Sequence, residues 1–200
     1  MITVVEAPER IVSLEEAKAH LRVTGAADDN LIGIFLDAAQ GKIDGPKGWL
    51  GRSLGAQTLE LALCEFPHCI VLPFGPVTSV VSIKYDDADG TEQTLDSDAY
   101  RLAGNVIELA SGGSWPAVHD QLNSVRIRYE AGTVPVPAEA KSAVLLMTGI
   151  FFSHAKRDAQ LKKSTVEGVG SREWDMSGNF DIAANKAAVS LVSGLKVWTV

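Results

Sequence analysis

The apolar residues of this chain change their spacing twice, and this change limits what the chain can fold into. Before residue 46 they recur every three or four positions, which is typical of helices that bury one face. From Gln57 to Glu130 they alternate with polar residues, as in an antiparallel sheet covered on one side. Helical spacing returns after Val136. This order predicts an α+β fold in which an antiparallel β-sheet layer is inserted into a small helical bundle.

Two helices are predicted before the sheet. The segment Ser13–Glu16 has the spacing of a capping box, so the first helix is expected from about residue 13 to 22. Asp28 or Asp29 is expected to cap the second helix, and a Gly-Pro pair ends it. The apolar residues expected on one face of the second helix are Leu31, Ile34, Phe35, Ala38 and Ile43.

Strands are predicted throughout the middle of the chain. Asp89–Gly90 and Gly104–Asn105 are expected to form tight hairpin turns. Pro73 and Pro76 lie in "LPFGPV" and cannot donate to a strand ladder, so this segment is expected to redirect the chain rather than bind a ligand. The alternating residues that predict the strands are Leu59, Leu61, Leu63, Val81, Ile83, Tyr85, Val125, Ile127 and Tyr129.

The last third of the chain predicts a third main helix, a polar arm and a C-terminal helix. The third helix should end near Lys156, and its apolar residues cover more than one stripe, which predicts partners on several sides. Residues 156–180 have the composition of an extended arm, and residues 182–192 are helical in pattern, with Gly194 as a cap. The predicted division is 1–55 helical hairpin, 56–132 antiparallel β layer, 133–157 central helix completing the bundle, and 158–200 extended arm and C-terminal docking helix.

The charge of the chain restricts its partners. It has 25 acidic and 18 basic residues, a formal net charge of -7 and a pI near 5.1. This argues against a protein that grips nucleic acid by neutralising phosphates, but a negative wall suits a conduit through which DNA passes. Apolar runs are well short of the ~20 residues of a membrane span, and the start does not resemble a secretory signal. We therefore expect a cytoplasmic protein without a membrane partner.

Residues able to carry chemistry do not form a known motif. Cys64, His68 and Cys69 supply at most three candidate zinc ligands, and we interpret the cysteines as reduced, half-buried thiols. "SGGSW" lacks the spacing of a nucleophile elbow, and "DDADG" lacks the later glutamate of a calcium loop. The sequence therefore predicts no catalytic residue, no metal, no cofactor and no enzyme.

Two groups of basic residues have a structural and a functional interpretation. Arg126 and Arg128 are expected on the polar face of the sheet, either solvated or in a salt bridge across a subunit interface. A second cluster follows the third helix, where cations are favoured by the helix dipole. That cluster could instead contact an acidic partner or DNA in a lumen, and its members are Lys156, Arg157, Lys162 and Lys163.

The order of several segments resembles a known family. These are "SLEEAKAHLRV", "DDNLIGIFLDAAQ", "GRSLGAQTLELAL", "IVLPFGPVTSVVSIKYDDADGTEQTL", "DAYRL", "GGSWP", "VRIRYEAG" and "VPAEAKSAVLLMTGIFF". Together they resemble the head-tail connector, or adaptor, family of long-tailed bacteriophages and phage-like gene transfer agents, from Val12 to about His154. "STVEGVGSREWDMSG" is similar to the family's arm and "AAVSLVSGLKVW" to its last helix.

The resemblance implies a structural role without catalytic residues. It implies a homo-oligomeric ring, expected to be dodecameric, at the neck of a virion or phage-like particle assembled in the bacterial host cytoplasm. The ring would bind the portal protein on one side and a downstream neck, stopper or tail-terminator protein on the other, with DNA passing through its lumen without sequence-specific binding. The residues expected to dock on the portal or another partner are Trp174, Phe180, Val189, Leu191, Val192, Leu195, Lys196, Val197 and Trp198.

Two alternatives remain open at this stage. One is another neck or tail-completion protein of the same kind of particle. The other is a small β-type ligand-binding module, in which Tyr100 and Trp115 would form a stacking platform on a concave exposed surface. The connector hypothesis also predicts that deleting residues 178–200 leaves the sheet folded but abolishes attachment to the portal.

Overall fold

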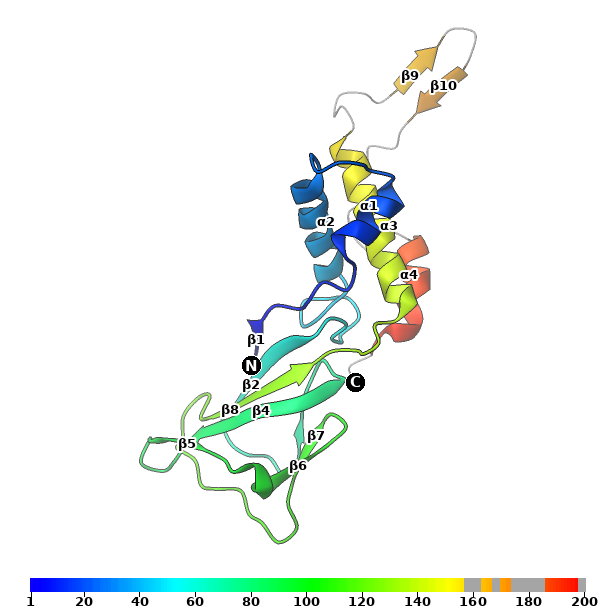
Figure 1. Cartoon of the computed structure of the whole chain (residues 1–200). Coiled ribbons are helices and arrows are strands. Elements are labelled where there is room, and N and C mark those ends of the chain that lie inside the picture. Colours follow the sequence, from blue (N-terminus) through cyan, green and yellow to red (C-terminus); the bar gives the residue numbers. More distant parts are fainter. Residues whose placement is uncertain (157–162, 167–169, 174–185, 198–200) are drawn as a thin grey trace.

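The computed structural model describes residues 1–156, 163–166, 170–173 and 186–197. Figure 1 shows a helical body and, below it, a body built from antiparallel sheets. The chain starts in the sheet, passes to the first two helices, returns to the sheet and then enters the remaining helices. The predicted α+β class, with a β layer inserted into a helical bundle, is confirmed.

The helical body contains α1 (Leu14–Leu21), α2 (Asp29–Gly41), α3 (Ala138–Ala155) and α4 (Lys186–Val192). Ser13 caps α1 as predicted: its hydroxyl accepts from the backbone N–H of Glu16 at 3.1 Å, and the Glu16 carboxylate accepts from the N–H of Ser13 at 2.8 Å. The buried apolar residues of the helical body are Ile11, Val12, Ala17, Ile32, Leu36, Ala39, Ile43, Leu50, Leu54, Ala140, Ala143, Val144, Met147, Phe152, Ala188 and Val192.

The buried face of α2 differs from the predicted one. Ile34 is 53% exposed and Ala38 is also exposed, whereas Ile32, Leu36 and Ala39 are buried. The buried face is therefore rotated by about one residue, or roughly 100°, from the predicted stripe, while the predicted residues Leu31, Phe35 and Ile43 still pack in the core. The reason is tertiary: α2 packs against both α1 and α3, so the face between them is buried even where the neighbouring stripe is equally apolar.

The central helix α3 packs against α1, α2 and α4, which explains why its apolar residues surround so much of its circumference. In Figure 1, α2 and α4 lie on opposite sides of α3. Ala188 and Val192 of α4 are fully buried in the same core. The last helix of this chain therefore covers part of the surface for which the sequence alone predicted other partners.

The main sheet has five antiparallel strands in the order β1-β2-β8-β4-β5. Their bounds are β1 Ile2–Glu6, β2 Gln57–Leu63, β8 Val125–Ala131, β4 Val77–Asp86 and β5 Glu92–Thr94. The alternation predicted for β2 and β8 is confirmed, since Leu59, Ile127 and Tyr129 are fully buried. No strand is predicted from the sequence at residues 2–6, yet this segment pairs with β2.

One predicted inward residue of β4 faces solvent. Val81 is 52% exposed, while Val80 packs against the sheet core and Ile83 is fully buried. The pairing of β4 with β8 shifts register between Val80 and Ser82. An irregularity of this kind adds a residue on one strand and changes which side chains point inward.

A second sheet covers the inner face of the first. Its strands are β3 (Ile70–Val71), β7 (Val106–Leu109) and β6 (Tyr100–Ala103), in the order β3-β7-β6. The two predicted hairpin turns are present, with Gly90 and Gly104 in the left-handed region at φ +79° and +63°. The buried residues shared by the two sheets are Leu59, Leu61, Ile70, Leu72, Ile83, Ile107, Val125, Ile127, Tyr129 and Ala131.

Two short strands follow α3 in the chain. β9 (Lys163–Val166) and β10 (Gly170–Glu173) form an antiparallel pair, drawn beyond the end of α3 that is farthest from the sheets in Figure 1. This pair lies within the segment for which an extended arm is predicted.

Candidate interaction surfaces

A buried carboxylate joins the helical body to the sheet. Asp44 is 5% exposed and accepts hydrogen bonds from the backbone N–H groups of Leu54 (2.7 Å) and Gly55 (3.1 Å). It also accepts from the side-chain amides of Gln40 (2.8 Å) and Gln57 (3.1 Å). One side chain therefore connects α2, the loop that follows it and β2.

The linker after β1 is held by the same network. The amide of Gln40 donates to the carbonyl oxygen of Glu9 at 2.7 Å, and its oxygen accepts from the N–H of Ile11 at 3.0 Å. Burial raises the pKa of Asp44, and its four hydrogen bonds oppose that rise without cancelling it. This polar joint fixes how the chain passes between the two bodies.

The segment "LPFGPV" also belongs to the joint. The backbone N–H of Ser53 lies within hydrogen-bond distance of the carbonyl oxygens of Phe74 (3.0 Å) and Gly75 (3.2 Å). The Tyr129 hydroxyl donates to the carbonyl oxygen of Pro73 at 2.7 Å. A Cβ atom on Gly75 would lie 2.3 Å from the amide nitrogen of Asn105, so a larger residue would displace the Asn105 side chain, which accepts a hydrogen bond from the N–H of Val77. The prediction that this segment redirects the chain is confirmed.

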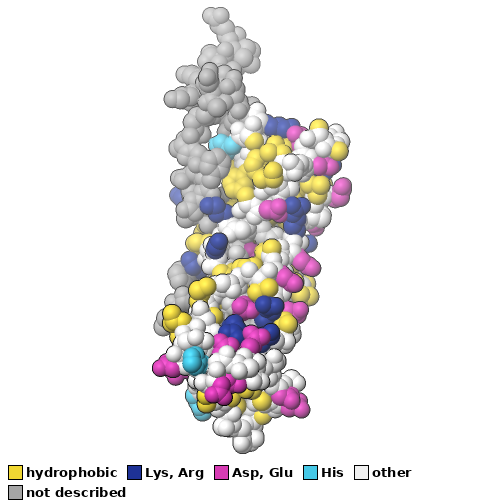
Figure 2. All heavy atoms as spheres, turned by 90° about the vertical axis from the view of Figure 1, so that its left-hand side faces the viewer, with side chains coloured by type: hydrophobic (Ala, Val, Ile, Leu, Met, Phe, Trp, Pro, Cys, Tyr) yellow, Lys and Arg dark blue, Asp and Glu magenta, His cyan; other side chains and the backbone are white. Residues whose placement is uncertain are grey.

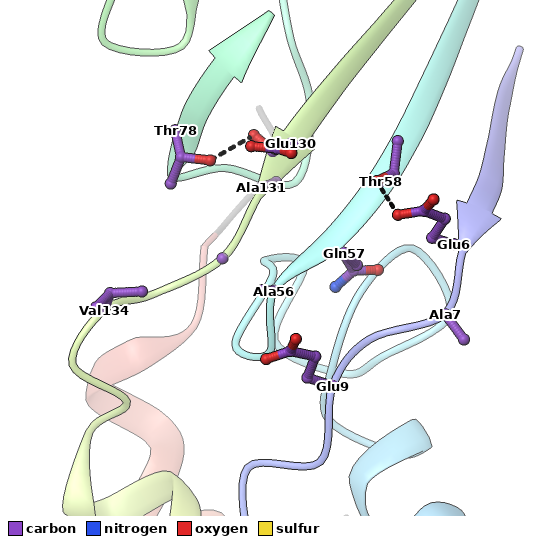
Figure 3. Close-up of a pocket in the computed structure, with 11 residues that line it drawn as sticks. Glu6, Ala7, Glu9, Ala56, Gln57, Thr58, Thr78, Glu130, Ala131 and Val134 are labelled. Carbon is purple, nitrogen blue, oxygen red and sulfur yellow. Dashed lines mark hydrogen bonds between the residues drawn. The ribbon is translucent and has the colours of Figure 1, made fainter. Parts of the chain in front are cut away.

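Beside the joint lies a hollow of about 400 Å³. Figure 3 shows Glu6, Glu9 and Glu130 around it, from β1, the following linker and β8. The carboxylate of Glu6 accepts from the Thr58 hydroxyl at 2.8 Å, and that of Glu130 accepts from the Ser79 hydroxyl at 2.8 Å. The hollow is therefore negatively charged, and strand residues hold the carboxylates of Glu6 and Glu130 in place.

The outer face of the sheet is covered by ion pairs. Figure 2 shows basic and acidic side chains intermingled over the lower part of the molecule. Arg126 lies 2.6 Å from Asp86 and 3.0 Å from Glu92, and Arg128 lies 2.9 Å from Glu60. Hydrogen bonding to Arg126 lowers the pKa of Asp86. These contacts are formed within the chain, so the two arginines need no neighbouring subunit as a partner.

Some of the residues predicted to dock on a partner are buried in this structure, and others are exposed. Val192 is fully buried, and Val189 and Leu195 are partly buried against the helical core. The sequence predicts Val192 as a docking residue, and in this structure its side chain packs inside the helical core. Leu191 and Val197 are exposed, at 37% and 47%.

Of the four remaining residues predicted to dock, Lys196 is among the described residues. The ammonium group of Lys196 lies 4.0 Å from the centre of the Trp49 ring, a cation–π contact that holds the chain end against the helical body. Trp174, Phe180 and Trp198 lie outside the described residues.

Only part of the predicted basic cluster can be placed. The ammonium group of Lys156 lies 2.7 Å from the carboxylate of Asp28 and 4.7 Å from the ring centre of Phe152. Arg157 and Lys162 lie outside the described residues, and Lys163 is the first residue of β9. Lys156 therefore stabilises the contact between α3 and the start of α2.

The residues considered for ligand chemistry have structural surroundings. Trp115 stacks on Phe66, with ring centres 4.8 Å apart and planes 3° apart, and both it and Tyr100 pack against the sheet core. Cys64 and Cys69 are free and exposed in the loop between β2 and β3, so the prediction that they are half-buried is wrong. Among the described residues, no group of three or more His, Cys, Asp or Glu could hold a metal ion.

Sequence reasoning missed the Asp44 joint and the acidic hollow. Asp44 precedes a Gly-Pro pair, which is typical of an exposed turn, so its burial could not be anticipated from local pattern. Glu6, Glu9 and Glu130 are far apart in the chain and meet only because β1 joins the sheet. No helix among the described residues has the length and hydropathy to cross a membrane.

The comparisons with known proteins agree with this architecture. Residues 11–100 match the model of the Phage gp6-like head-tail connector protein family. The resemblance to head-tail connectors is confirmed. Comparison with curated proteins gives no match. The matched range contains α1, α2 and the first part of the sheet, including the joint around Asp44.

Solved structures are similar to this chain over its whole length. A chain of the neck of an empty GTA particle, computed with C6 symmetry, has a TM-score of 0.70 and 21% identity. A chain of the virion of a native gene transfer agent particle has a TM-score of 0.68 and 22% identity. A chain of the neck of a native GTA particle, computed with C12 symmetry, has 0.63 and 19%. Each comparison covers 100% of this chain and 97% of the other; these likenesses show the fold.

Proposed function

We propose that this protein is a structural head-tail connector at the neck of a phage or phage-like gene transfer particle. The observation that carries the proposal is the agreement of two comparisons: the connector family model over residues 11–100 and the whole-chain likeness to chains of GTA necks. The working form is a ring of identical copies, dodecameric as in a C12 arrangement. Each contact in such a ring joins two different patches of neighbouring copies.

The ring binds the portal on one side and the next neck or tail protein on the other. The exposed C-terminal side chains Leu191 and Val197 support a docking role at the chain end, together with the predicted residues outside the described range. DNA passes through the lumen without sequence-specific binding, which agrees with the net charge of -7. The role is structural rather than catalytic.

The hypothesis of a β-type ligand-binding module has less support. It requires Tyr100 and Trp115 to share an exposed concave surface, whereas both rings pack against the sheet core and Trp115 stacks on Phe66. Neither residue lines the acidic hollow.

The direct test uses the full chain together with the portal protein of the same particle. Co-sedimentation followed by negative-stain imaging should show a ring with a central hole stacked on the portal. A protein that stays monomeric and does not sediment with portal rings would contradict the proposal.

Point variants separate docking from folding better than a deletion of residues 178–200, because Ala188 and Val192 belong to the helical core. The double variant Leu191→Asp/Val197→Asp changes two exposed side chains, and we expect at least a tenfold loss of portal binding. Val71→Asp, at a position 63% exposed on β3, is the matched control and should bind like the original chain.

A further inference from the structure

A large apolar side chain stands out at the end of the sheet that lies farthest from the helices. Leu122 is 81% exposed in the loop of residues 119–123, which leads into β8 beside the β4–β5 turn. A single exposed apolar residue on a soluble protein needs no explanation by itself. The surroundings of Leu122 are what make it informative.

The loop that carries this leucine is held rigidly by buried groups. The hydroxyl of fully buried Ser124 lies within hydrogen-bond distance of the carbonyl oxygens of His119 (2.7 Å) and Gln121 (2.9 Å). The guanidinium of Arg126 donates to the carbonyl oxygen of Asn123 at 3.0 Å. Asn123 is in the left-handed region at φ +62°, which asparagine tolerates better than most residues. An apolar side chain on a fixed loop loses little entropy on binding, as in interface anchors.

The loop is also fastened to the neighbouring β4–β5 turn. The N–H of His119 donates to the carbonyl oxygen of Asp86 at 2.9 Å, and the Gln121 amide donates to the Asp86 carboxylate at 3.3 Å. Asp120 is exposed two positions before Leu122, and Asp89 is exposed in the turn directly after Ala88, whose carbonyl oxygen lies 3.4 Å from a ring nitrogen of His119. The apolar tip therefore lies on a loop held by hydrogen bonds, with exposed carboxylates at Asp120 and Asp89, while the nearby charge of Arg126 is already paired with Asp86 and Glu92.

This inference rests on the proposed connector function. We propose that Leu122 is an apolar anchor that enters a pocket on the next neck protein, and that the pocket is rimmed by Lys or Arg side chains. The leucine supplies apolar contact area, while Asp89 and Asp120 pair with the basic rim and orient the approach. DNA does not fit this surface, because its phosphates would be repelled by the same aspartates.

A second copy of this chain is a poor partner for the acidic tip. Eight of the 18 basic residues of the chain form ion pairs within it: Arg10, Lys18, Lys84, Arg101, Arg126, Arg128, Lys141 and Lys156. The chain as a whole has seven more acidic than basic residues. A different protein with an available basic surface is the better complement.

The test replaces Leu122 by Glu in the full chain and produces whole particles with it. Two quantities are measured on purified particles: the amount of this protein per head and the fraction of heads that carry tails in negative stain. We expect the amount per head to stay within about twofold of the original and the tailed fraction to fall at least tenfold. The charge variant Asp89→Lys/Asp120→Lys should lower the tailed fraction while the protein stays on the heads.

Val71→Glu is the matched control, since it places the same charge at another exposed apolar position, and it should give normal tails. A normal tailed fraction with Leu122→Glu would overturn the inference. So would loss of the variant from the heads while its thermal melting is unchanged, because the contact would then involve the portal or another copy. Absence of the original protein from the heads would instead refute the connector function itself.

Discussion

The two bodies of this protein are assembled from the chain in different ways. The buried residues of the sheet body come from one continuous stretch, Leu59 to Ala131, whereas those of the helical body come from residues 11–54, 140–152 and 188–192. The core of the sheet body is therefore complete within one stretch of the chain, although β2 and β4 pair with the distant strand β8, while the helical core is complete only when α4 packs against α3. The helical body also includes residues near the end of the chain for which docking is predicted.

Polar residues form the contact between the two bodies, whereas the core of each body is apolar. Asp44, Gln40 and Gln57 form it from buried hydrogen bonds, and the Gln57 amide oxygen is buried without a partner. Because each hydrogen bond in this network requires its own partner and geometry, the network specifies one arrangement more strictly than apolar packing does. The difference between the two bodies and their joint therefore predicts three distinct effects of substitutions. These are unfolding of the helical body, loss of the joint and a local loss of stability in the sheet.

The largest effect is expected from a charge in the part of the helical core that the last helix supplies. Val192→Asp places an unpaired carboxylate at a fully buried position and should lower the free energy of unfolding of the helical body by about 3 kcal/mol or more. Trp49 packs on the helical core and Trp115 on the sheet core, so single-tryptophan variants report on each body in chemical denaturation.

The control for Val192→Asp is Leu191→Asp, one position earlier on the same helix but 37% exposed, which should change stability by less than about 0.5 kcal/mol. If the Trp115 signal shifts as far as the Trp49 signal, the two bodies unfold as one unit. The distinction drawn between them would then be wrong.

A smaller effect is expected at the joint. Asp44→Ala removes the acceptor for the N–H groups of Leu54 and Gly55, which then remain buried without partners. We expect a loss of about 2–4 kcal/mol, since each unsatisfied buried group costs about 1–3 kcal/mol. Denaturation followed by circular dichroism measures it, and Asp37→Ala, an exposed position on α2, is the control. Equal stability of the two variants would show that the joint does not contribute.

Within the sheet, Tyr129→Phe removes a single hydrogen bond. The hydroxyl donates to the carbonyl oxygen of Pro73 at 2.7 Å and ties β8 to the redirecting loop, while the ring remains fully buried. We expect a loss of about 1 kcal/mol, seen by the Trp115 signal and not by the Trp49 signal. Tyr85→Phe, on the neighbouring strand β4, is the control. A shift in the Trp49 signal would mean that the loop transmits stability to the helices.

The accuracy of sequence-based prediction differs between these regions for physical reasons. The cap of α1, the alternation in β2 and β8, and both hairpin turns were predictable because the signals lie within a few residues of each other. Ile34 and Val81 were assigned to the wrong side, because α2 is apolar on adjoining faces and β4 contains a register shift.

The candidate surfaces were harder to predict. Val192 is predicted to dock because it is apolar and lies near the end of the chain, and its burial in the helical core is seen only in the structure. The Asp44 joint depends on backbone groups ten and eleven residues away, and the rigid support of Leu122 depends on Ser124 and Asp86. The contacts of Asp44 and Asp86 join residues that are far apart in the chain and carry no local sequence signal, so they were found only in the structure.

The smallest expected effect is a pH dependence assigned to the joint. Burial raises the pKa of Asp44, so between its unfolded and folded values the folded protein holds a proton that the unfolded chain has released. The folded state then binds more protons, and the contribution of Asp44 to stability falls as pH rises through this window. Asp44→Asn has no such proton. The free energy of unfolding of the original chain should therefore decline relative to the variant as pH is raised from about 4.

The surface carboxylates whose pKa is lowered, such as Asp86 and Glu92, act in the opposite direction but are present in both proteins and cancel. A difference that stays constant or grows with pH would mean that Asp44 is ionised as readily in the folded protein as in the unfolded chain.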